Sequence, residues 1–293
     1  MRFTLALPMC PADRLLTLAR IADEAGWDAV SMPDSVFFPE EVSADYPYTS
    51  DGRRFWPDDA PWVDPWVAIP AMAAVTERLA FYTNVLKTPL RHPLLVAKTV
   101  GSTAAMFPGR IGLGLGLSWM PEEFSWLHQD MRTRGKRLDE QIEVLRAVLD
   151  GGWVEHHGPH YDFDRLRMEP SPSEQVPIYV GGHSDPALRR AARLGDGWIG
   201  AQVDQAEAAA VVKRLHEALD EAGRSRHGFE VKLTPIVPAT PEAMVELASV
   251  GVTDVITVPW FFAGGDPTDP AEQERSIAWF ADTVIDPVRT AAS

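Results

Sequence analysis

The run from Arg110 to Trp119 combines an apolar strand pattern with a glycine at every second position. Glycine has no side chain, so neighbouring backbone amides can come close to a phosphate or a flat aromatic ring. No Gly-Lys-Ser/Thr follows, which excludes a Walker loop, and the spacing is a poor dinucleotide-binding fingerprint. Because Gly112, Gly114 and Gly116 share one face of one strand, the run indicates either a ligand site or a crowded barrel strand.

A second glycine pair begins the segment Gly181-Gly182-His183-Ser184, which lies between an apolar run ending at Val180 and a proline at position 186. Serine is a common helix cap, and proline suits the first helical turn. The free amides at such a helix start attract anions. The segment therefore predicts an anion site, and an ordinary strand-to-helix turn with a serine cap is the alternative.

Three histidines, His156, His157 and His160, lie close together in the chain. The sequence holds no second histidine or cysteine cluster that would complete a zinc site, so we predict no metal. It also holds no Gly-x-Ser-x-Gly elbow and no cysteine–histidine pairing that would indicate a hydrolase. His92 precedes a proline at a helix start, which favours a capping role over catalysis.

Aromatic side chains are concentrated between positions 35 and 63, and a second group follows at Trp260-Phe261-Phe262. Together they would wall an apolar pocket for a small-molecule substrate. For any single residue, pinning the long loop to the protein or burying a dimer contact is an equal alternative. Arg53-Arg54 would bind an anionic substrate or form an exposed basic pair. The aromatic residues of the first group are Phe37, Phe38, Tyr46, Tyr48, Phe55, Trp56 and Trp62.

Short apolar strands alternate with amphipathic helices along the whole chain. Strands that are apolar throughout suit a parallel sheet buried on both faces. Eight strand–helix units in this length predict an α/β fold, the (β/α)8 TIM barrel. The open doubly wound sheet is the alternative, but its glycine fingerprint is missing after the first strand. The predicted strands are 3–7, 29–32, 79–85, 110–116, 177–180, 197–201, 229–237 and 254–258.

Two connections are too long for plain strand-to-helix loops, namely 35–63 after strand 2 and 117–176 after strand 4. Loops of this length in compact domains usually have a function or are disordered. Both leave from the carboxyl ends of strands, where barrel enzymes place their sites. No flexible linker or internal repeat interrupts the pattern, so we expect a single domain over residues 1–293.

Composition narrows the possible partners and the compartment. The net charge of −15 argues against nucleic acid and anionic membranes as partners, since both favour a basic surface. Cys10 is the single cysteine, so no internal disulfide forms and a reducing, cytoplasmic location is expected. The sequence shows no signal peptide and no apolar run long enough to span a bilayer.

Five longer segments occur in a fixed order: EAGWDAVSMPDS, PLRHPLLVAKTVGS, GRIGLGLGLSW, RGKRLDEQIEVLRAVL and PIYVGGHSDPALRRAARLGDGW. Over most of residues 1–200 they resemble the luciferase-like flavin and deazaflavin enzymes, with a weaker match in the last third. The second and fifth segments are similar to the actinobacterial members that use the deazaflavin coenzyme F420. The resemblance implies a barrel with insertions and an oxidoreductase that transfers a hydride between the deazaflavin C5 and a small organic substrate.

The resemblance also implies where a coenzyme would lie, namely across the carboxyl-terminal mouth of the barrel. Its phosphate would be held by the two glycine segments, and Tyr82-Thr83-Asn84-Val85 would lie under the ring. Family members often carry a bulge with a non-proline cis peptide there, and an ordinary strand end is the alternative. Ser118 stands where the family often has glycine, so its hydroxyl would donate to phosphate or narrow the pocket. The implied coenzyme-binding residues are Asp34, Thr83, Asn84, Val85, Gly116, Ser118, Trp119, Gly181, Gly182, His183 and Ser184.

The pair Asp34-Ser35 departs from the family pattern, because many deazaflavin members have Asp-His at this place. In those members the histidine can contact the ring and move a proton. Serine is a poor acid or base, so that mechanism is not carried over and the catalytic residue stays unassigned. Asp34 would orient a group at the ring or cap a turn, and both residues remain weak catalytic candidates.

Two other functions fit the same resemblance. One is an FMN-dependent monooxygenase that receives reduced flavin from a partner reductase and activates oxygen. The other is a non-catalytic flavin-binding barrel, which the missing histidine keeps open. The resemblance also implies a homodimer.

Overall fold

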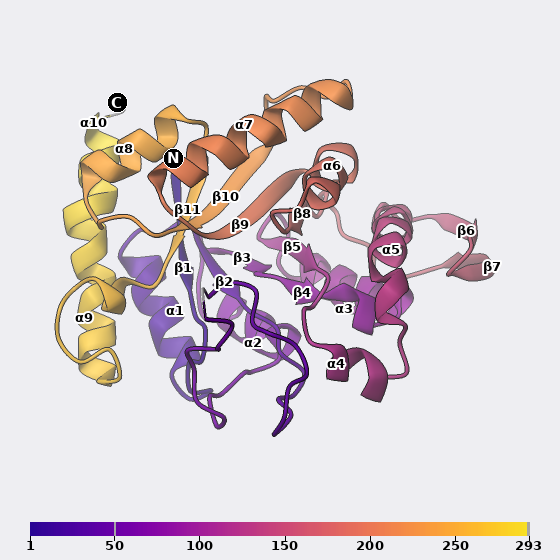
Figure 1. The fold of residues 1–293 in the computed structure, drawn as a ribbon, viewed down its shortest axis with the longest axis horizontal. Helices are drawn as coiled ribbons and strands as arrows, with labels where there is room; N and C mark the ends of the chain where they lie inside the picture. Colours follow the sequence, from indigo (N-terminus) through magenta and orange to yellow (C-terminus); the bar gives the residue numbers. More distant parts are fainter. Residues whose placement is uncertain (50, 292–293) are drawn as a thin grey trace.

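The computed structural model describes residues 1–49 and 51–291. Within them, eight parallel strands close into a barrel with helices around it, as the sequence predicts (Figure 1). The strands follow one another round the ring as β3, β2, β1, β11, β10, β9, β8 and β5, and pairing of β3 with β5 closes it. They are β1 (Arg2–Ala6), β2 (Ala29–Met32), β3 (Ala80–Thr83), β5 (Ile111–Gly116), β8 (Ile178–Gly181), β9 (Gly197–Val203), β10 (Glu230–Pro235) and β11 (Asp254–Thr257).

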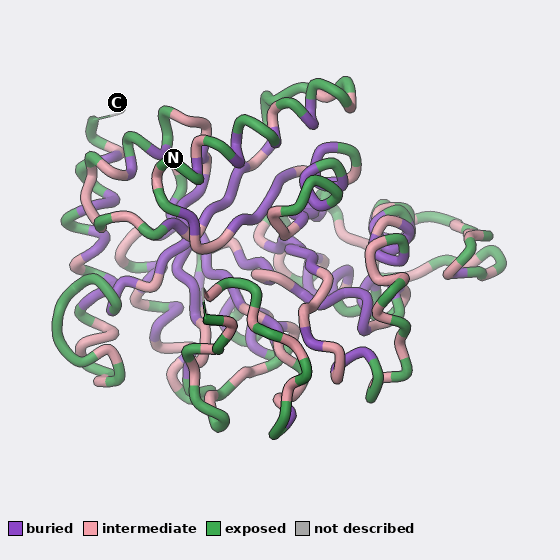
Figure 2. The backbone as a smooth tube through the Cα atoms, in the orientation of Figure 1, coloured by how far each residue is buried: buried purple, intermediate pink, exposed green. Residues whose placement is uncertain are grey.

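A helix covers the barrel after each of these strands, and the strands are buried beneath them (Figure 2). Proline and a capping side chain set several helix starts. Asp64 accepts a hydrogen bond from Trp66 N at 2.8 Å, and His92 Nδ1 accepts one from Leu94 N at 3.2 Å, the capping role predicted for it. The covering helices are α1 (Leu15–Glu24), α2 (Pro65–Ala73), α3 (Pro93–Met106), α5 (Arg134–Leu149), α6 (Asp185–Leu194), α7 (Gln205–Glu221), α8 (Pro241–Ser249) and α9 (Pro270–Phe280).

The third predicted strand, 79–85, is shorter than expected, because β3 ends at Thr83. After an interruption at Asn84 and Val85, a separate strand, β4 (Leu86–Lys87), pairs with the upper part of β5 through Leu86 and Leu115. The peptide bond between Asn84 and Val85, in the interruption, is cis. A short 3-10 turn, η1 (Thr88–Leu90), then leads to α3.

Insertions follow the second and fourth barrel strands, β2 and β5, as predicted. The first, 35–63, contains no helix or strand among its described residues. The second contains α4 (Pro121–Trp126), the turn η2 (Met131–Thr133) and an antiparallel hairpin beyond α5 (Figure 1). The hairpin strands are β6 (Trp153–His157) and β7 (Asp162–Arg167).

The carboxyl-terminal end contains elements that the sequence reasoning missed. A 3-10 turn, η3 (Pro259–Phe261), follows β11, and α9 continues through a π turn, η4 (Ala281–Ile285), into α10 (Asp286–Ala291). In the described part of the chain, no helix has both the length and the apolar character needed to cross a bilayer.

Crowding inside the barrel explains much of the glycine run in β5. A Cβ built on Gly114 would lie 1.9 Å from Thr83 O, and one on Gly112 would lie 3.0 Å from Tyr179 Cε2. Thr83 Oγ1 also donates to Gly114 O at 2.7 Å. The alternating glycines therefore let β5 approach its neighbours closely, which supports the crowded-strand alternative for these two positions.

The barrel interior also holds charges that the apolar strand pattern did not indicate. Lys232 Nζ, which is buried, lies 2.6 Å from Asp254 Oδ2 and 2.8 Å from Glu230 Oε2. The same nitrogen lies 4.4 Å and 4.5 Å from the ring centroids of Tyr179 and Tyr82. Each charge has a partner of opposite sign or an aromatic face, which is how a protein interior tolerates ions.

Candidate active site

The ends of three neighbouring strands meet around the side chain of Val85. A Cβ on Gly116 would lie 2.3 Å from Val85 Cγ2, and one on Gly181 would lie 3.1 Å from Val85 Cγ1. Asn84, across the cis peptide, donates its backbone N–H to Met32 O at 2.7 Å. The fold thus brings together the strand-end residues that the sequence analysis placed beside a coenzyme.

The loop from β5 to α4 adopts an unusual backbone at Ser118, whose φ is +62°. The Ser118 hydroxyl donates to Glu123 Oε2 at 2.6 Å, and Met120 N donates to Ser118 Oγ at 3.3 Å. The hydroxyl proton is therefore directed at a carboxylate, not at the space where a phosphate was expected. In the described part of the chain, the backbone N–H groups of Ser118 and Trp119 have no acceptor.

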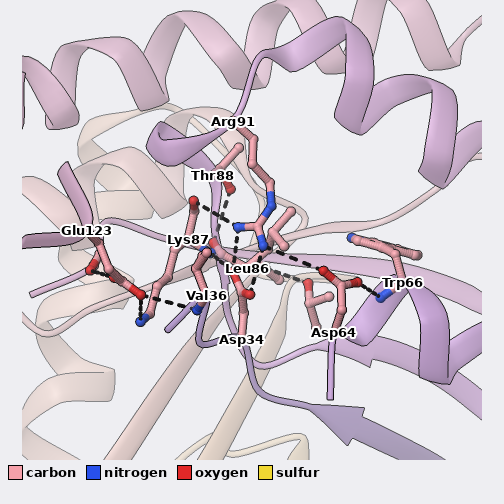
Figure 3. A network of polar contacts seen from close by, with 12 residues as sticks. Asp34, Val36, Asp64, Trp66, Leu86, Lys87, Thr88, Arg91 and Glu123 are labelled. Carbon is pink, nitrogen blue, oxygen red and sulfur yellow. Dashed lines mark hydrogen bonds and ion pairs between the residues drawn. The ribbon is translucent and has the colours of Figure 1, made fainter. Parts of the chain in front are cut away.

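Glu123 is fully buried, and its carboxylate accepts hydrogen bonds from three segments of the chain (Figure 3). Its Oε1 accepts from Lys87 Nζ at 2.6 Å and from Val36 N at 3.3 Å, while its Oε2 accepts from Ser118. Lys87 ends β4, and Val36 is the second residue of the first insertion. The carboxylate thus compensates a buried cation and also fixes the starts of two loops.

Asp34, at the end of β2, is nearly inaccessible. Its carboxylate accepts hydrogen bonds from Arg91 Nη1 at 2.7 Å, from Arg91 Nη2 at 2.9 Å and from the backbone N of Lys87 at 2.8 Å (Figure 3). Both oxygens are occupied, so the arrangement favours a positioning role over proton transfer. The hydroxyl of Ser35, by contrast, has no polar partner among the residues that the structure describes.

The turn from β8 to α6 places a histidine at the mouth. His183 Nε2 accepts a hydrogen bond from Ala201 N at 3.0 Å, so the ring proton must lie on Nδ1. Burial, reinforced by the nearby Arg214 guanidinium, lowers the pKa of His183 below its usual 6.5. The imidazole is thus a neutral donor at pH 7, and Nδ1 has no partner in the described residues.

Further backbone donors lie in the same turn. Gly182 N reaches Ile199 O at 3.4 Å, whereas the N–H groups of His183 and Ser184 have no acceptor among the described residues. The side chain of Ser184 makes no capping bond, contrary to the expected serine cap. Gly182 has a φ of +116°, and a Cβ built on it would lie 3.0 Å from Ala187 Cβ, so any side chain there would strain the backbone.

The aromatic residues of the 35–63 insertion lie across both loops. The Tyr46 ring is 5.4 Å from the Trp119 ring, and the Tyr48 ring is 6.2 Å from the His183 ring. Burial raises the pKa of Tyr46 to about 12, so its hydroxyl stays protonated at neutral pH. The insertion therefore bridges the two segments that the sequence analysis predicts to bind phosphate.

Other sequence candidates take less central roles. Arg54 stacks on Phe38 at 3.7 Å and forms an ion pair with Asp58. Phe261 and Phe262 are exposed after β11. The clustered histidines contact carboxylates, His156 with Glu140 at 3.1 Å and His157 with Asp162 at 2.6 Å. Within the described residues, no group of three or more metal-binding side chains is arranged around one point.

Sequence reasoning missed Lys87 and Arg91 as parts of this region. It did not connect Glu123 with this region either. The available signal was a charged residue inside an otherwise apolar stretch, as Lys87 is in NVLKTPL. Such a residue needs a buried partner of opposite charge, but the sequence does not say which carboxylate supplies it.

Comparison with known proteins gives matches along nearly the whole chain. The profile of the luciferase-like monooxygenase family matches residues 3–282. An uncharacterized protein of Mycobacterium tuberculosis, Rv0940c, is 40% identical over 289 residues, which cover 97% of this chain and 99% of that protein. An F420-dependent glucose-6-phosphate dehydrogenase of Nakamurella multipartita is 30% identical, with 72% of this chain and 59% of that one covered.

A solved structure shares the fold at low sequence identity. The F420-dependent tetrahydromethanopterin reductase from Methanopyrus kandleri superposes with a TM-score of 0.76 at 15% identity. The superposition covers 98% of this chain and 99% of the reductase chain.

Proposed function

Because this chain belongs to the luciferase-like monooxygenase family, we propose that it is an F420-dependent oxidoreductase. It would transfer a hydride between the deazaflavin C5 and a small organic substrate. The observation that carries the proposal is the set of unpartnered backbone N–H groups at Ser118, Trp119, His183 and Ser184. They follow two strands whose last glycines, Gly116 and Gly181, leave little room for a side chain beside Val85.

These residues suit a flat ring that carries an anionic tail. Backbone N–H groups and the neutral His183 donor would bind the phosphate without a change of protonation. Val85 and the short Gly116 and Gly181 would let the ring lie close to the strand ends. When bound, the coenzyme supplies the hydride chemistry, while the barrel orients it and excludes water.

The charge around the tail site favours the deazaflavin over FMN. The tail of F420 begins with a phosphodiester, which carries one negative charge, whereas the phosphomonoester of FMN approaches two at neutral pH. Cations near the mouth already have carboxylate partners, as Arg214 has Asp185 and Lys87 has Glu123. Neutral donors are better matched to a single charge than to two. The F420-dependent relative supports the same choice.

The substrate would bind above the ring, beneath the aromatic residues of the 35–63 insertion. Tyr46, Trp56 and Trp119 form a packed group there, with ring centroids 4.9 Å and 5.4 Å from that of Tyr46. An apolar or aromatic substrate would match this surface. We also propose a homodimer, because Val67 on α2 and Leu95 and Met106 on α3 are exposed large apolar side chains on adjacent helices.

The experiment that tests the proposal is an equilibrium titration of the purified protein with oxidised F420 and with FMN. We expect F420 to bind at least about tenfold more tightly, a difference of about 1.4 kcal/mol. Tight FMN binding with no response to F420 would contradict the coenzyme choice and would favour the FMN-dependent monooxygenase with a reductase partner. Binding without turnover across a broad panel of substrates would favour a non-catalytic flavin-binding barrel.

A further inference from the structure

We propose that Glu123 is a positioning residue that, through Ser118, holds the β5–α4 loop in the conformation that binds the coenzyme tail. The same carboxylate would hold the start of the 35–63 insertion against that loop. The effect on tail binding rests on the proposed function. The group that carries the inference is Val36, Lys87, Ser118 and Glu123, called here the Glu123 cluster.

The backbone of Ser118 adopts a conformation that is unfavourable for a residue with a Cβ. Its φ of +62° lies in the left-handed region, which costs a residue with a Cβ on the order of 1 kcal/mol. Glycine would adopt this conformation without that cost. Ser118 instead donates a 2.6 Å hydrogen bond to the buried Glu123 carboxylate. A charge-assisted bond of this kind offsets the strain, so the hydroxyl holds the turn that leaves the Ser118 and Trp119 amides free.

The charges of Glu123 and Lys87 are both buried. Glu123 is fully buried, and Lys87 is nearly so, with their charged atoms 2.6 Å apart. Buried ion pairs are poor sources of stability, although they fix one arrangement in several systems. Here the arrangement fixed is the junction of β4 with the β5–α4 loop, on which the tail site depends.

The start of α4 contacts the 35–63 insertion directly. Val36 N donates to Glu123 Oε1 at 3.3 Å, and Ser43 N donates to the neighbouring Glu122 Oε1 at 3.0 Å. The start of α4 thus binds the first residues of the insertion, whose Tyr46 packs on Trp119. One acidic pair therefore connects the tail loop with the segment above the ring.

The decisive comparison is between Ser118→Ala and Ser118→Gly. Both lose the hydroxyl, but only alanine keeps a Cβ in the left-handed region. We expect Ser118→Ala to weaken F420 binding by about tenfold or more, and Ser118→Gly by less than about threefold. Affinity for the deazaflavin riboside, which lacks the phosphodiester tail, should change in neither. Ser125→Ala is the matched control, because the hydroxyl of that exposed serine donates to Glu122 O and makes no hydrogen bond to a residue of the Glu123 cluster in the described part of the chain.

Two results would overturn the inference. Equal losses in the alanine and glycine variants would mean that the hydroxyl contacts the tail directly and does not position the loop. An unchanged ratio of tailed to tail-less affinity in Ser118→Ala would mean that the loop conformation is irrelevant to the tail. If FMN binds instead of F420, the ratio of FMN to riboflavin affinity gives the same test. The coenzyme choice can then fail while this inference stands.

A measurement on the free protein keeps the inference testable without any coenzyme. Glu123→Gln alone would leave the buried Lys87 without a counter-charge, so the double variant Glu123→Gln/Lys87→Met is used to restore neutrality. We expect faster hydrogen exchange in peptides covering 36–43 and 117–126 for this variant, and in 117–126 for Ser118→Ala, which leaves the bond from Val36 N to Glu123 Oε1 in place. Faster exchange confined to 117–126 in the double variant would overturn the proposed connection to the insertion.

Discussion

The two carboxylate oxygens of Asp34 face the two terminal nitrogens of Arg91, at 2.7 and 2.9 Å. This two-pronged ion pair joins the end of β2 to the turn before α3, and the backbone N of Lys87 completes it at 2.8 Å. The residue that the sequence offered as a catalytic candidate is therefore bound on both oxygens. Asp34 is therefore placed to position the segments around the barrel mouth.

Removing the Asp34 carboxylate should affect stability more than chemistry. We expect Asp34→Ala to lower the free energy of unfolding by about 3 kcal/mol, because the partly buried Arg91 loses its two-pronged partner and, among the charged groups of the described residues, keeps only the weaker pair with Asp64 at 3.9 Å. Asp34→Asn, which keeps one acceptor, should cost less. Urea unfolding measures the loss, and the pH dependence of turnover should keep its shape. A stable Asp34→Asn variant in which one limb of that pH profile disappears would show that the carboxylate transfers a proton.

The neutral His183 should make the fold weaker in acid. Its pKa in the folded protein is lowered by burial and by Arg214, so the unfolded chain binds the proton more readily. Stability therefore rises with pH between the lowered folded pKa and about 6.5, and falls as the pH drops through that window.

Replacement of this side chain tests the sign of that dependence. We expect His183→Asn to flatten the slope of unfolding free energy against pH below about 6.5. Some slope should remain, because burial also lowers the pKa of His216. An unchanged slope, measured by urea unfolding at several pH values, would mean that His183 is not held neutral.

Two glycines of β5 should differ in how they tolerate alanine. A Cβ on Gly114 would lie 1.9 Å from a backbone oxygen, whereas one on Gly112 would lie 3.0 Å from a tyrosine ring edge. We expect Gly114→Ala to prevent folding or to cost more than about 3 kcal/mol, and Gly112→Ala to cost about 1–3 kcal/mol. Circular dichroism and thermal unfolding distinguish the two. Similar stability of both variants would contradict the crowded packing of β5 against β3.

The buried Lys232 should be costly to remove alone and less costly to remove with its partner. We expect Lys232→Met to lower the unfolding free energy by about 3–5 kcal/mol, because Asp254 and Glu230 lose their shared cation. Lys232→Met/Asp254→Asn should recover part of that loss. The single variant Asp254→Asn completes the cycle, and losses of the two single variants that sum to the loss of the double variant would show that the ion pair contributes no coupling.

Much of the fold follows from local sequence patterns. Apolar strands, helix caps such as Asp64 and the glycine at position 26 that ends α1 predict the eight strand–helix units and both insertions. Strand ends differ by one or two residues, because hydrogen bonding at an end depends on the neighbouring strand. The π turn and α10 were missed, since they continue directly from α9 without a separate helix start.

The site could be predicted only as a set of loops. Sequence placed Gly116, Ser118, Gly181 and His183 at strand ends, and the fold confirms that position. It could not show that Ser118 bonds to Glu123 or that Asp34 bonds to Arg91, because these pairs form across the barrel mouth between distant segments. Long-range pairing of charges depends on register and tilt, which a local pattern does not contain.

A crystal structure of the protein soaked with oxidised F420 tests the central claim most directly. We expect the phosphodiester oxygens to lie within about 3.2 Å of the backbone nitrogens of Ser118 or Trp119 and of His183 or Ser184. His183 Nδ1 should donate to the same group, and the ring should lie over Val85. A phosphate bound elsewhere, or amide groups that stay turned away from it, would contradict the account.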